Sequence, residues 1–271
     1  MSDVNLSAAT RTNLLALQRT TDLIARTQER LSTGLKVNSA IDDAIAYFQA
    51  KSLTDRAGDL AVLKGDIDQG VSSIESASSG IESISDVVEQ MKGVALSAKS
   101  DADTVNRSKS AVQFNDLRSQ LDNLANDASY KGTNLIKGSP ANLKVTFSED
   151  GSSTLTISGV ASDSSGLSIT GAVNNWGVDG NIDAAINDLD SALTTLRSTA
   201  SSLGTNASVL SLRLDFTKNL IDSLEEGSAK LVNADLNEES ANLLTLQTRQ
   251  QLGTIGLSIA QQSEQSILRL F

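Results

Sequence analysis

The feature that most constrains the fold is an apolar spacing of three and four residues that recurs in separate segments of the chain. Between Leu60 and Ala98 this spacing is interrupted only by Gly70. It returns between Phe114 and Ala128, and over a longer run between Ile186 and Leu231. Alternating steps of three and four place side chains on one face of an α-helix, which is typical of helices packed side by side. The sequence therefore predicts a mainly α fold built from long helices.

The two longest segments are expected to pack on each other as an antiparallel helical hairpin, or coiled-coil bundle, formed by both halves of the chain. A helix over about residues 181–232 would be about 80 Å long at ~1.5 Å per residue, which predicts a rod rather than a compact domain. The residues expected to pack along this rod are Leu60, Leu63, Ile67, Ile74, Ile81, Ile84, Val88, Leu189, Leu196, Leu203 and Leu210.

Residues 132–180 have a different composition from the rest of the chain. They hold eight of the 18 glycines and the single proline, Pro140. Short apolar alternations at residues 143–147, 155–157 and 167–169 predict strands, and residues 149–151 supply a turn between the first two. We expect a small β-rich outer insertion that projects from the end of the rod.

The two ends of the chain are expected to pair in one layer. Residues 1–40 carry five basic and three acidic side chains, whereas residues 235–271 carry two basic and four acidic ones, so their net charges have opposite signs. Both apolar seams contain polar or glycine positions, which predicts terminal helices that are poorly stable alone. The seam residues, expected to serve polymerisation, are Leu14, Leu17, Ile24, Leu31, Leu243, Leu246, Leu257, Ile267 and Phe271.

These observations predict three domains. Residues 1–38 and 237–271 form an inner terminal-helix domain, residues 39–131 and 181–236 form the helical rod, and residues 132–180 form the outer domain. Where the N-terminal helix meets the rod, Ser39 and Asp42 fit a capping box at a connecting segment, or spoke. Asp42 and Asp43 also favour a helix N-terminus electrostatically. As a catalytic carboxylate pair they lack a basic or metal partner nearby in the sequence.

Composition excludes most enzyme chemistry. The 271 residues include no histidine and no cysteine, which removes thiol nucleophiles, thiolate metal sites, Ser/His triads and histidine-rich zinc motifs. No catalytic, cofactor-binding or metal-binding residue is therefore expected. The net charge of −11 argues against nucleic acid and anionic membranes as partners, because both require a basic face.

The first residues show no run of 7–15 apolar side chains, so no cleavable signal peptide is expected. No stretch approaches the ~20 apolar residues of a membrane span. These patterns leave two expectations open: a cytosolic protein, or one that leaves the cell by a route that does not read such a signal.

Both ends of the chain resemble bacterial flagellin. The N-terminal resemblance includes Asn5-Leu6, Thr10-Arg11 and residues 30–44, which read RLSTGLKVNSAIDDA. The C-terminal resemblance includes residues 238–241 (EESA), 246–252 (LQTRQQL) and 267–271 (ILRLF). Together with the long-helix pattern, the resemblance covers nearly the whole chain except residues 132–180.

The resemblance implies a structural subunit that polymerises with itself into the flagellar filament for motility. It implies that the paired terminal helices line the central channel, that the long helices form the tube wall and that the remaining domain faces outward. It also implies unfolded export by the flagellar type III apparatus, with a chaperone, cap and hook-associated proteins as partners, and an extracellular location.

Three points qualify what the resemblance implies. A hook–filament junction protein is the alternative function, because such proteins share the terminal helices. The zinc-protease insertion of some flagellins needs a His-Glu-x-x-His helix, which a chain without histidine does not have.

Flagellins that activate the vertebrate innate receptor resemble LQRVRELA in the segment where residues 88–95 of this chain read VEQMKGVA. Gln90 stands in place of the first arginine of that motif, and Gly93 stands in place of its glutamate. We therefore expect weak or absent receptor recognition.

Overall fold

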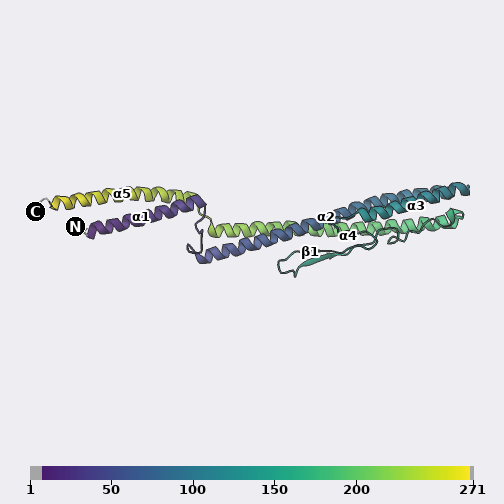
Figure 1. The fold of residues 1–271 in the computed structure, drawn as a ribbon, viewed down its shortest axis with the longest axis horizontal. Coiled ribbons are helices and arrows are strands. Elements are labelled where there is room, and N and C mark those ends of the chain that lie inside the picture. Colours follow the sequence, from purple (N-terminus) through teal and green to yellow (C-terminus); the bar gives the residue numbers. More distant parts are fainter. Residues whose placement is uncertain (1–7, 269–271) are drawn as a thin grey trace. The chain divides into compact units, whose positions relative to one another are not determined.

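The computed structural model describes residues 8–268. Over these residues it contains five α-helices, one short 3₁₀ turn and a two-stranded sheet (Figure 1). In chain order the elements are α1 (Ala8–Thr33), α2 (Ala44–Ser100), α3 (Thr104–Asp127), β1 (Leu143–Thr146), β2 (Thr154–Ile157), η1 (Val173–Trp176), α4 (Asp179–Val232) and α5 (Leu236–Leu268). The predicted fold class, mainly α with a small β insertion, is confirmed.

The chain divides into two compact units. Unit 1 consists of Met1–Arg56 and Ser223–Phe271, and unit 2 consists of Ala57–Asp222. Helices α2 and α4 contribute residues to both units. In unit 1, α1 and α5 lie side by side, which confirms the expected pairing of the two ends (Figure 1).

Unit 2 is organised around one apolar core to which α2, α3 and α4 contribute. Nine of the eleven predicted rod positions, all except Leu60 and Leu63, occupy it, because a spacing of three and four turns them to one face of each helix. Ile67, Ile74 and Leu196 are fully buried, and Leu63 is half-buried. The remaining positions, all buried, are Leu60, Ile81, Ile84, Val88, Leu189, Leu203 and Leu210.

Three ion pairs fix the N-terminal part of α4 against its neighbours in unit 2. Asp190 binds Lys92, Asp183 binds Lys99, and Asp179 binds Arg107 at the start of α3. Most of these side chains are largely exposed, so each pair contributes at most about 1 kcal/mol. Their main effect is on register, because a helix that slid by one turn would lose all three.

The insertion contains two strands, not the three that the sequence predicts. β1 pairs antiparallel with β2, with Leu143 opposite Ile157, and the predicted turn between them is confirmed by Gly151 at a φ of +70°. Leu167 and Ile169 are buried without forming a strand. The Ile169 carbonyl accepts a hydrogen bond from Nε of Arg118 on α3, and the Ile169 amide donates to the Ser164 carbonyl.

The sequence predicts that the insertion projects from the end of the rod, and this prediction is wrong. The insertion packs along the helices of unit 2. Val145, Ile157 and Trp176 belong to the same core as α2, α3 and α4. An isolated two-stranded hairpin is marginally stable in water, so its apolar face needs a helical surface on which to pack.

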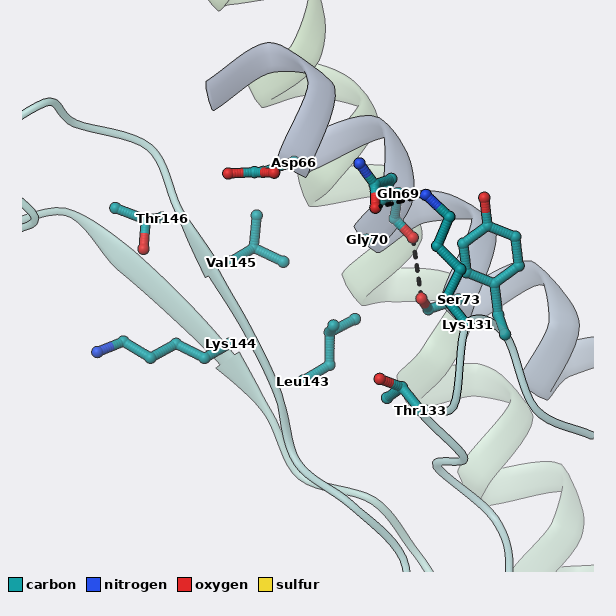
Figure 2. Close-up of a pocket in the computed structure, with 11 residues that line it drawn as sticks. Asp66, Gln69, Gly70, Ser73, Lys131, Thr133, Leu143, Lys144, Val145 and Thr146 are labelled. Atoms are coloured by element: carbon teal, nitrogen blue, oxygen red, sulfur yellow. Dashed lines mark hydrogen bonds between the residues drawn. The ribbon is translucent and has the colours of Figure 1, made fainter. Parts of the chain in front are cut away.

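Gly70, the one interruption of the apolar pattern in α2, marks where the hairpin packs. A Cβ atom at Gly70 would lie 2.8 Å from a Val145 methyl carbon and 3.3 Å from Leu210 Cδ1. Figure 2 shows β1 beside α2, where both Gly70 and Val145 line a cavity of about 410 Å³. The missing side chain therefore lets β1 approach the helix closely.

Replacing Gly70 with valine is expected to displace β1 from α2. The cost is about 1–3 kcal/mol, typical of overpacking, reduced by the better helix propensity of the new residue. Hydrogen exchange at the amides of residues 143–157 measures the displacement. The control is Gly65→Val in the same helix, where a Cβ atom meets nothing within 4 Å. Equal protection of the hairpin in both variants would contradict the packing described here.

Candidate functional site

The described residues offer no centre for metal-dependent chemistry. Within residues 8–268 no group of three or more histidine, cysteine, aspartate or glutamate side chains is placed to hold a metal ion. The same part of the chain has no helix that combines the length and the apolar character of a membrane span. The candidate site considered below is the surface of unit 1, which carries the described residues that the sequence predicts for polymerisation.

Helices α1 and α5 approach each other closely, but the apolar side chains of the seam between them are only partly buried. Ile24 is buried, whereas Leu17 and Leu31 are half-buried and Leu14 is 37% exposed. Opposite them on α5, a Cβ atom at Gly253 would lie 2.8 Å from Leu17 Cδ1, so glycine allows the helices to approach. The pair thus has little apolar burial of its own.

The predicted seam residues of α5 face α1 only in part. Leu243, Leu246 and Leu257 are half-buried. Ile267 belongs to α5, but its side chain lies outside the described residues, as does Phe271. The described seam residues therefore pack within the chain, and their role in polymerisation stays a prediction.

An ion pair joins the two terminal helices where they meet the rest of unit 1. Nη1 of Arg30 on α1 lies 2.9 Å from Oε1 of Glu239 on α5. The Glu239 side chain is only 10% exposed and that of Arg30 is 34% exposed. A carboxylate this buried needs its partner, because an unpaired charge out of water is costly.

Replacing Arg30 with alanine is expected to destabilise the α1–α5 pair by about 1–3 kcal/mol, because Glu239 would be left buried without a charged partner. Hydrogen exchange of the α1 and α5 amides in the full chain is the measurement. The matched control is Arg19→Ala, an exposed arginine on the same helix. The double variant Arg30→Met with Glu239→Leu is expected to recover much of the loss. A double variant no more stable than Arg30→Ala would contradict this account.

The segment between α1 and α2 holds unit 1 together through its backbone. Gly34 ends α1 at a φ of +73°, and its carbonyl accepts a hydrogen bond from the Ala234 amide at 2.9 Å. The Lys36 amide donates to the Val232 carbonyl at 2.7 Å. Non-glycine residues rarely adopt this left-handed conformation, so glycine suits the end of the helix.

The predicted helix cap at Ser39 is wrong. Helix α2 begins at Ala44, and the side chain of Asp43 accepts from the Ala46 amide at 3.0 Å, which makes Asp43 the N-cap. Asp42, expected in the first turn, lies before the helix. An aspartate directly before the first helical residue can reach the free amides of the first turn, whereas Ser39 lies too early in the chain to do so.

Asp42 and Ser39 instead stabilise the spoke itself. Oδ2 of Asp42 accepts from the Ser39 amide at 3.0 Å, from the Ser39 hydroxyl at 3.1 Å and from the Asn38 amide at 3.1 Å. The hydrogen bond from the Ser39 amide holds the pKa of Asp42 below its usual value. The carboxylate therefore stays ionised as an acceptor that closes this loop.

A second set of apolar residues on unit 1 faces away from the seam and was not among the predicted seam residues. On α5, Leu244, Leu252, Ile255 and Ile259 are between 56% and 67% exposed. The sequence does contain a sign of this face, because apolar residues occur on more than one side of the helix. What it does not show is which of the two faces α1 covers.

Comparison with known protein families matches both ends of the chain. The bacterial flagellin N-terminal helical region matches residues 4–141, and the bacterial flagellin C-terminal helical region matches residues 186–271. Solved structures of similar fold include a putative flagellar hook-associated protein from Vibrio parahaemolyticus, with a TM-score of 0.60 at 14% identity over 71% of this chain and 100% of that one. A Bacillus cereus flagellin has a TM-score of 0.50 at 16% identity over 56% of this chain and 88% of that one.

Relatives that match over the full length of this chain are also similar in sequence. Flagellin FljM of Caulobacter vibrioides is 34% identical over 100% of this chain and 99% of its own. A flagellin of Brucella melitensis is 31% identical over the same shares of both chains. The chain therefore belongs to the bacterial flagellin family, a family of structural proteins that are subunits of the flagellar filament.

Proposed function

We propose that the terminal helices α1 and α5 are the part of this filament subunit that drives its assembly. The observation that carries this proposal is the exposed apolar face of α5 beside a seam that is only partly buried. Ordering helices of this kind costs conformational entropy that their own packing offsets poorly. Burial against neighbouring subunits supplies the missing free energy and stabilises the ordered state by mass action.

The three predicted domains then have distinct roles. Residues 1–38 and 237–271 form the filament core, residues 39–131 and 181–236 form the tube wall, and residues 132–180 face outward. Support for this division comes from the two matched family regions, which flank residues 142–185. It also comes from the different composition of the insertion.

Copy number tests the proposed role against that of a hook–filament junction protein. A filament subunit is expected to be the abundant protein of sheared filaments, whereas a junction protein is present in few copies. Quantitative mass spectrometry of sheared filaments measures this ratio. The flagellins that match over the full length favour the subunit, because the likeness to the hook-associated protein, at 14% identity, concerns the fold alone.

Export through the flagellar apparatus, with a chaperone, is the proposed route out of the cell, and the cap and hook-associated proteins are the proposed partners at the filament. Support comes from family membership and from terminal helices whose seam is only partly buried. The proposed location is the extracellular filament. Cells that lack the export apparatus should retain the protein, and its undiminished release from them would refute this route.

Weak or absent recognition by the vertebrate innate flagellin receptor is expected from residues 88–95. Gln90 and Gly93 replace an arginine and a glutamate of the activating pattern, and both are exposed. Lys92 is the remaining cation, but its Nζ binds Asp190 and it lacks the bidentate geometry of arginine. A receptor reporter assay with purified monomer is expected to show little activation. The variant Gln90→Arg with Lys92→Arg and Gly93→Glu should gain activity, and potent activation by the unaltered monomer would contradict the prediction.

A further inference from the structure

The cavity beside Gly70 has polar walls that the packing of the hairpin does not explain. It has a volume of about 410 Å³ and lies where α2, β1 and the turn at residues 130–133 meet (Figure 2). Volumes of about 300–1,000 Å³ are typical of sites for small molecules. All its lining residues lie between residues 66 and 146 and therefore belong to unit 2.

Helix α2 forms a polar wall of this cavity. Asp66, Gln69 and Ser73 follow one another in steps of three and four, which places them on one face of the helix. The Ser73 hydroxyl donates to the Gln69 carbonyl at 2.9 Å. The Asp66 carboxylate is exposed and forms no hydrogen bond or ion pair with another described residue. It is therefore an acceptor that a ligand can use.

The turn at residues 130–133 forms a second wall, and its backbone is held in place. Tyr130 and Thr133 exchange two backbone hydrogen bonds, both of 2.9 Å, and Lys131 and Gly132 between them have φ of +47° and +83°, as in a type I′ turn. Nζ of Lys131 donates to Oε1 of Gln69 at 3.0 Å and so joins the turn to α2. The hydroxyls of Tyr130 and Thr133 have no hydrogen-bond partner among the described residues, so they can bind a ligand.

Strand β1 forms the third wall and contributes backbone groups. The amide of Phe147, directly after β1, donates to the carbonyl of Ser153, directly before β2, at 2.8 Å. Bonded and non-bonded pairs alternate along an antiparallel ladder, so Lys144 and Thr146 direct their N–H and C=O groups to the edge away from β2. The described sheet has no third strand at that edge, and both residues line the cavity.

The charges of the cavity favour a neutral ligand. Lys131 already binds Gln69, and Figure 2 shows the side chain of Lys144 directed away from α2, so neither lysine concentrates positive charge there. Asp66 is the one carboxylate among the lining residues, and a divalent cation needs more oxygen ligands than it supplies. The remaining lining groups are hydroxyls, an amide, backbone groups and the apolar side chains of Leu143 and Val145.

We infer that this cavity binds a neutral saccharide of one or two pyranose rings. Each sugar hydroxyl both donates and accepts hydrogen bonds, which matches walls that offer donors and acceptors side by side. The apolar C–H face of a pyranose matches the half-buried side chain of Leu143. The inference concerns residues of unit 2 alone and does not rest on the proposed role of α1 and α5 in assembly.

Tyrosine signals test the inference in the full, unassembled chain. The chain has two tyrosines, Tyr130 at the cavity and Tyr47 in unit 1, so ring ¹³C labelling gives a reporter and an internal control. The variant Tyr130→Phe assigns the two signals. Titration with glucose, N-acetylglucosamine or cellobiose should shift the Tyr130 signal, with saturation in the millimolar range for at least one of these sugars, and leave that of Tyr47 unchanged. Inorganic phosphate should shift neither signal.

A matched pair of variants locates the binding. Asp66→Ala should weaken saccharide binding about ten-fold, because hydrogen bonds to a charged group are strong. The control is Asp68→Ala, an exposed aspartate of α2 that does not line the cavity, and its Kd should stay within about two-fold of the unaltered chain, as no contact to the sugar is lost. At ten times the Kd, the β1 amides that bond to β2 should exchange about 11-fold more slowly, because the sugar binds only the closed hairpin.

Four outcomes would overturn the inference. They are the absence of a saturable Tyr130 shift with all three sugars, equal shifts of both tyrosines, equal losses for Asp66→Ala and Asp68→Ala, and tighter binding of phosphate than of any sugar. Each is measured on the unassembled chain, so each is distinct from a failure to form filaments.

Discussion

Removing residues 1–35 and 237–271 together is expected to abolish filament formation and to leave a helical monomer. The deletion takes away α1 and nearly all of α5, and with them the seam and the Arg30–Glu239 pair. Unit 2 keeps its core, because every member of that core lies between residues 67 and 210. If each subunit loses only about 2.8 kcal/mol of its free energy of association, the concentration needed for assembly rises ~100-fold. The deletion removes two whole helices and is therefore expected to have a larger effect.

Electron microscopy and sedimentation of the truncated protein, beside the full chain under the same polymerisation conditions, measure the effect. Circular dichroism at 222 nm shows whether the helices of unit 2 remain. A single deletion of residues 1–35 is an informative intermediate, because it leaves α5 in place with the seam uncovered. Filaments formed by the doubly truncated protein at the concentration that suffices for the full chain would contradict the role assigned to α1 and α5.

The helices are the part of the fold that the sequence predicts best, and the reason is physical. A buried helix face needs apolar residues every three or four positions, so burial of a helix can be recognised from the spacing of its apolar residues. Ile67, Ile74 and Leu196, predicted from spacing alone, are fully buried. Long helices repeat this spacing many times, so their existence can be predicted even where their first and last residues cannot.

The packing of the insertion could not be predicted in the same way. Short alternations indicate strands, but they do not show which surface covers the apolar face. Gly70 was visible as a gap in the pattern of α2, yet only the position of Val145 explains it. The alternation of Leu167 and Ile169 predicts a strand, but burial against helices favours apolar residues at the same positions.

The sequence predicts that a polar side chain caps the N-terminus of α2, but it does not identify which of three candidates does so. Ser39, Asp42 and Asp43 are all capable of accepting hydrogen bonds from free backbone amides. Which one caps α2 depends on where the spoke ends, and backbone hydrogen bonds between residues 34–36 and 232–234 fix that segment. These contacts join residues about two hundred positions apart in the sequence, so the local pattern around residue 39 cannot predict them.

Replacing Phe114 with alanine is expected to cause a large loss of stability in unit 2. Phe114 on α3 is fully buried, and its ring centroid lies 5.0 Å from that of Trp176. Removing a buried phenylalanine ring typically costs about 3–5 kcal/mol, from lost burial and from the cavity that remains. For a unit of this size the midpoint of thermal unfolding should fall on the order of 10 °C.

Trp176 makes this loss easy to follow, because it is the single tryptophan of the chain. Its Nε1 is buried without a hydrogen-bond partner, so packing is what holds the indole in place. Urea unfolding followed by tryptophan fluorescence gives the free energy of unfolding of unit 2. The matched control is Phe216→Ala on α4, where the ring is 57% exposed and the expected change is within about 0.5 kcal/mol. Equal losses for the two variants would mean that the aromatic contact between α3 and η1 does not stabilise unit 2.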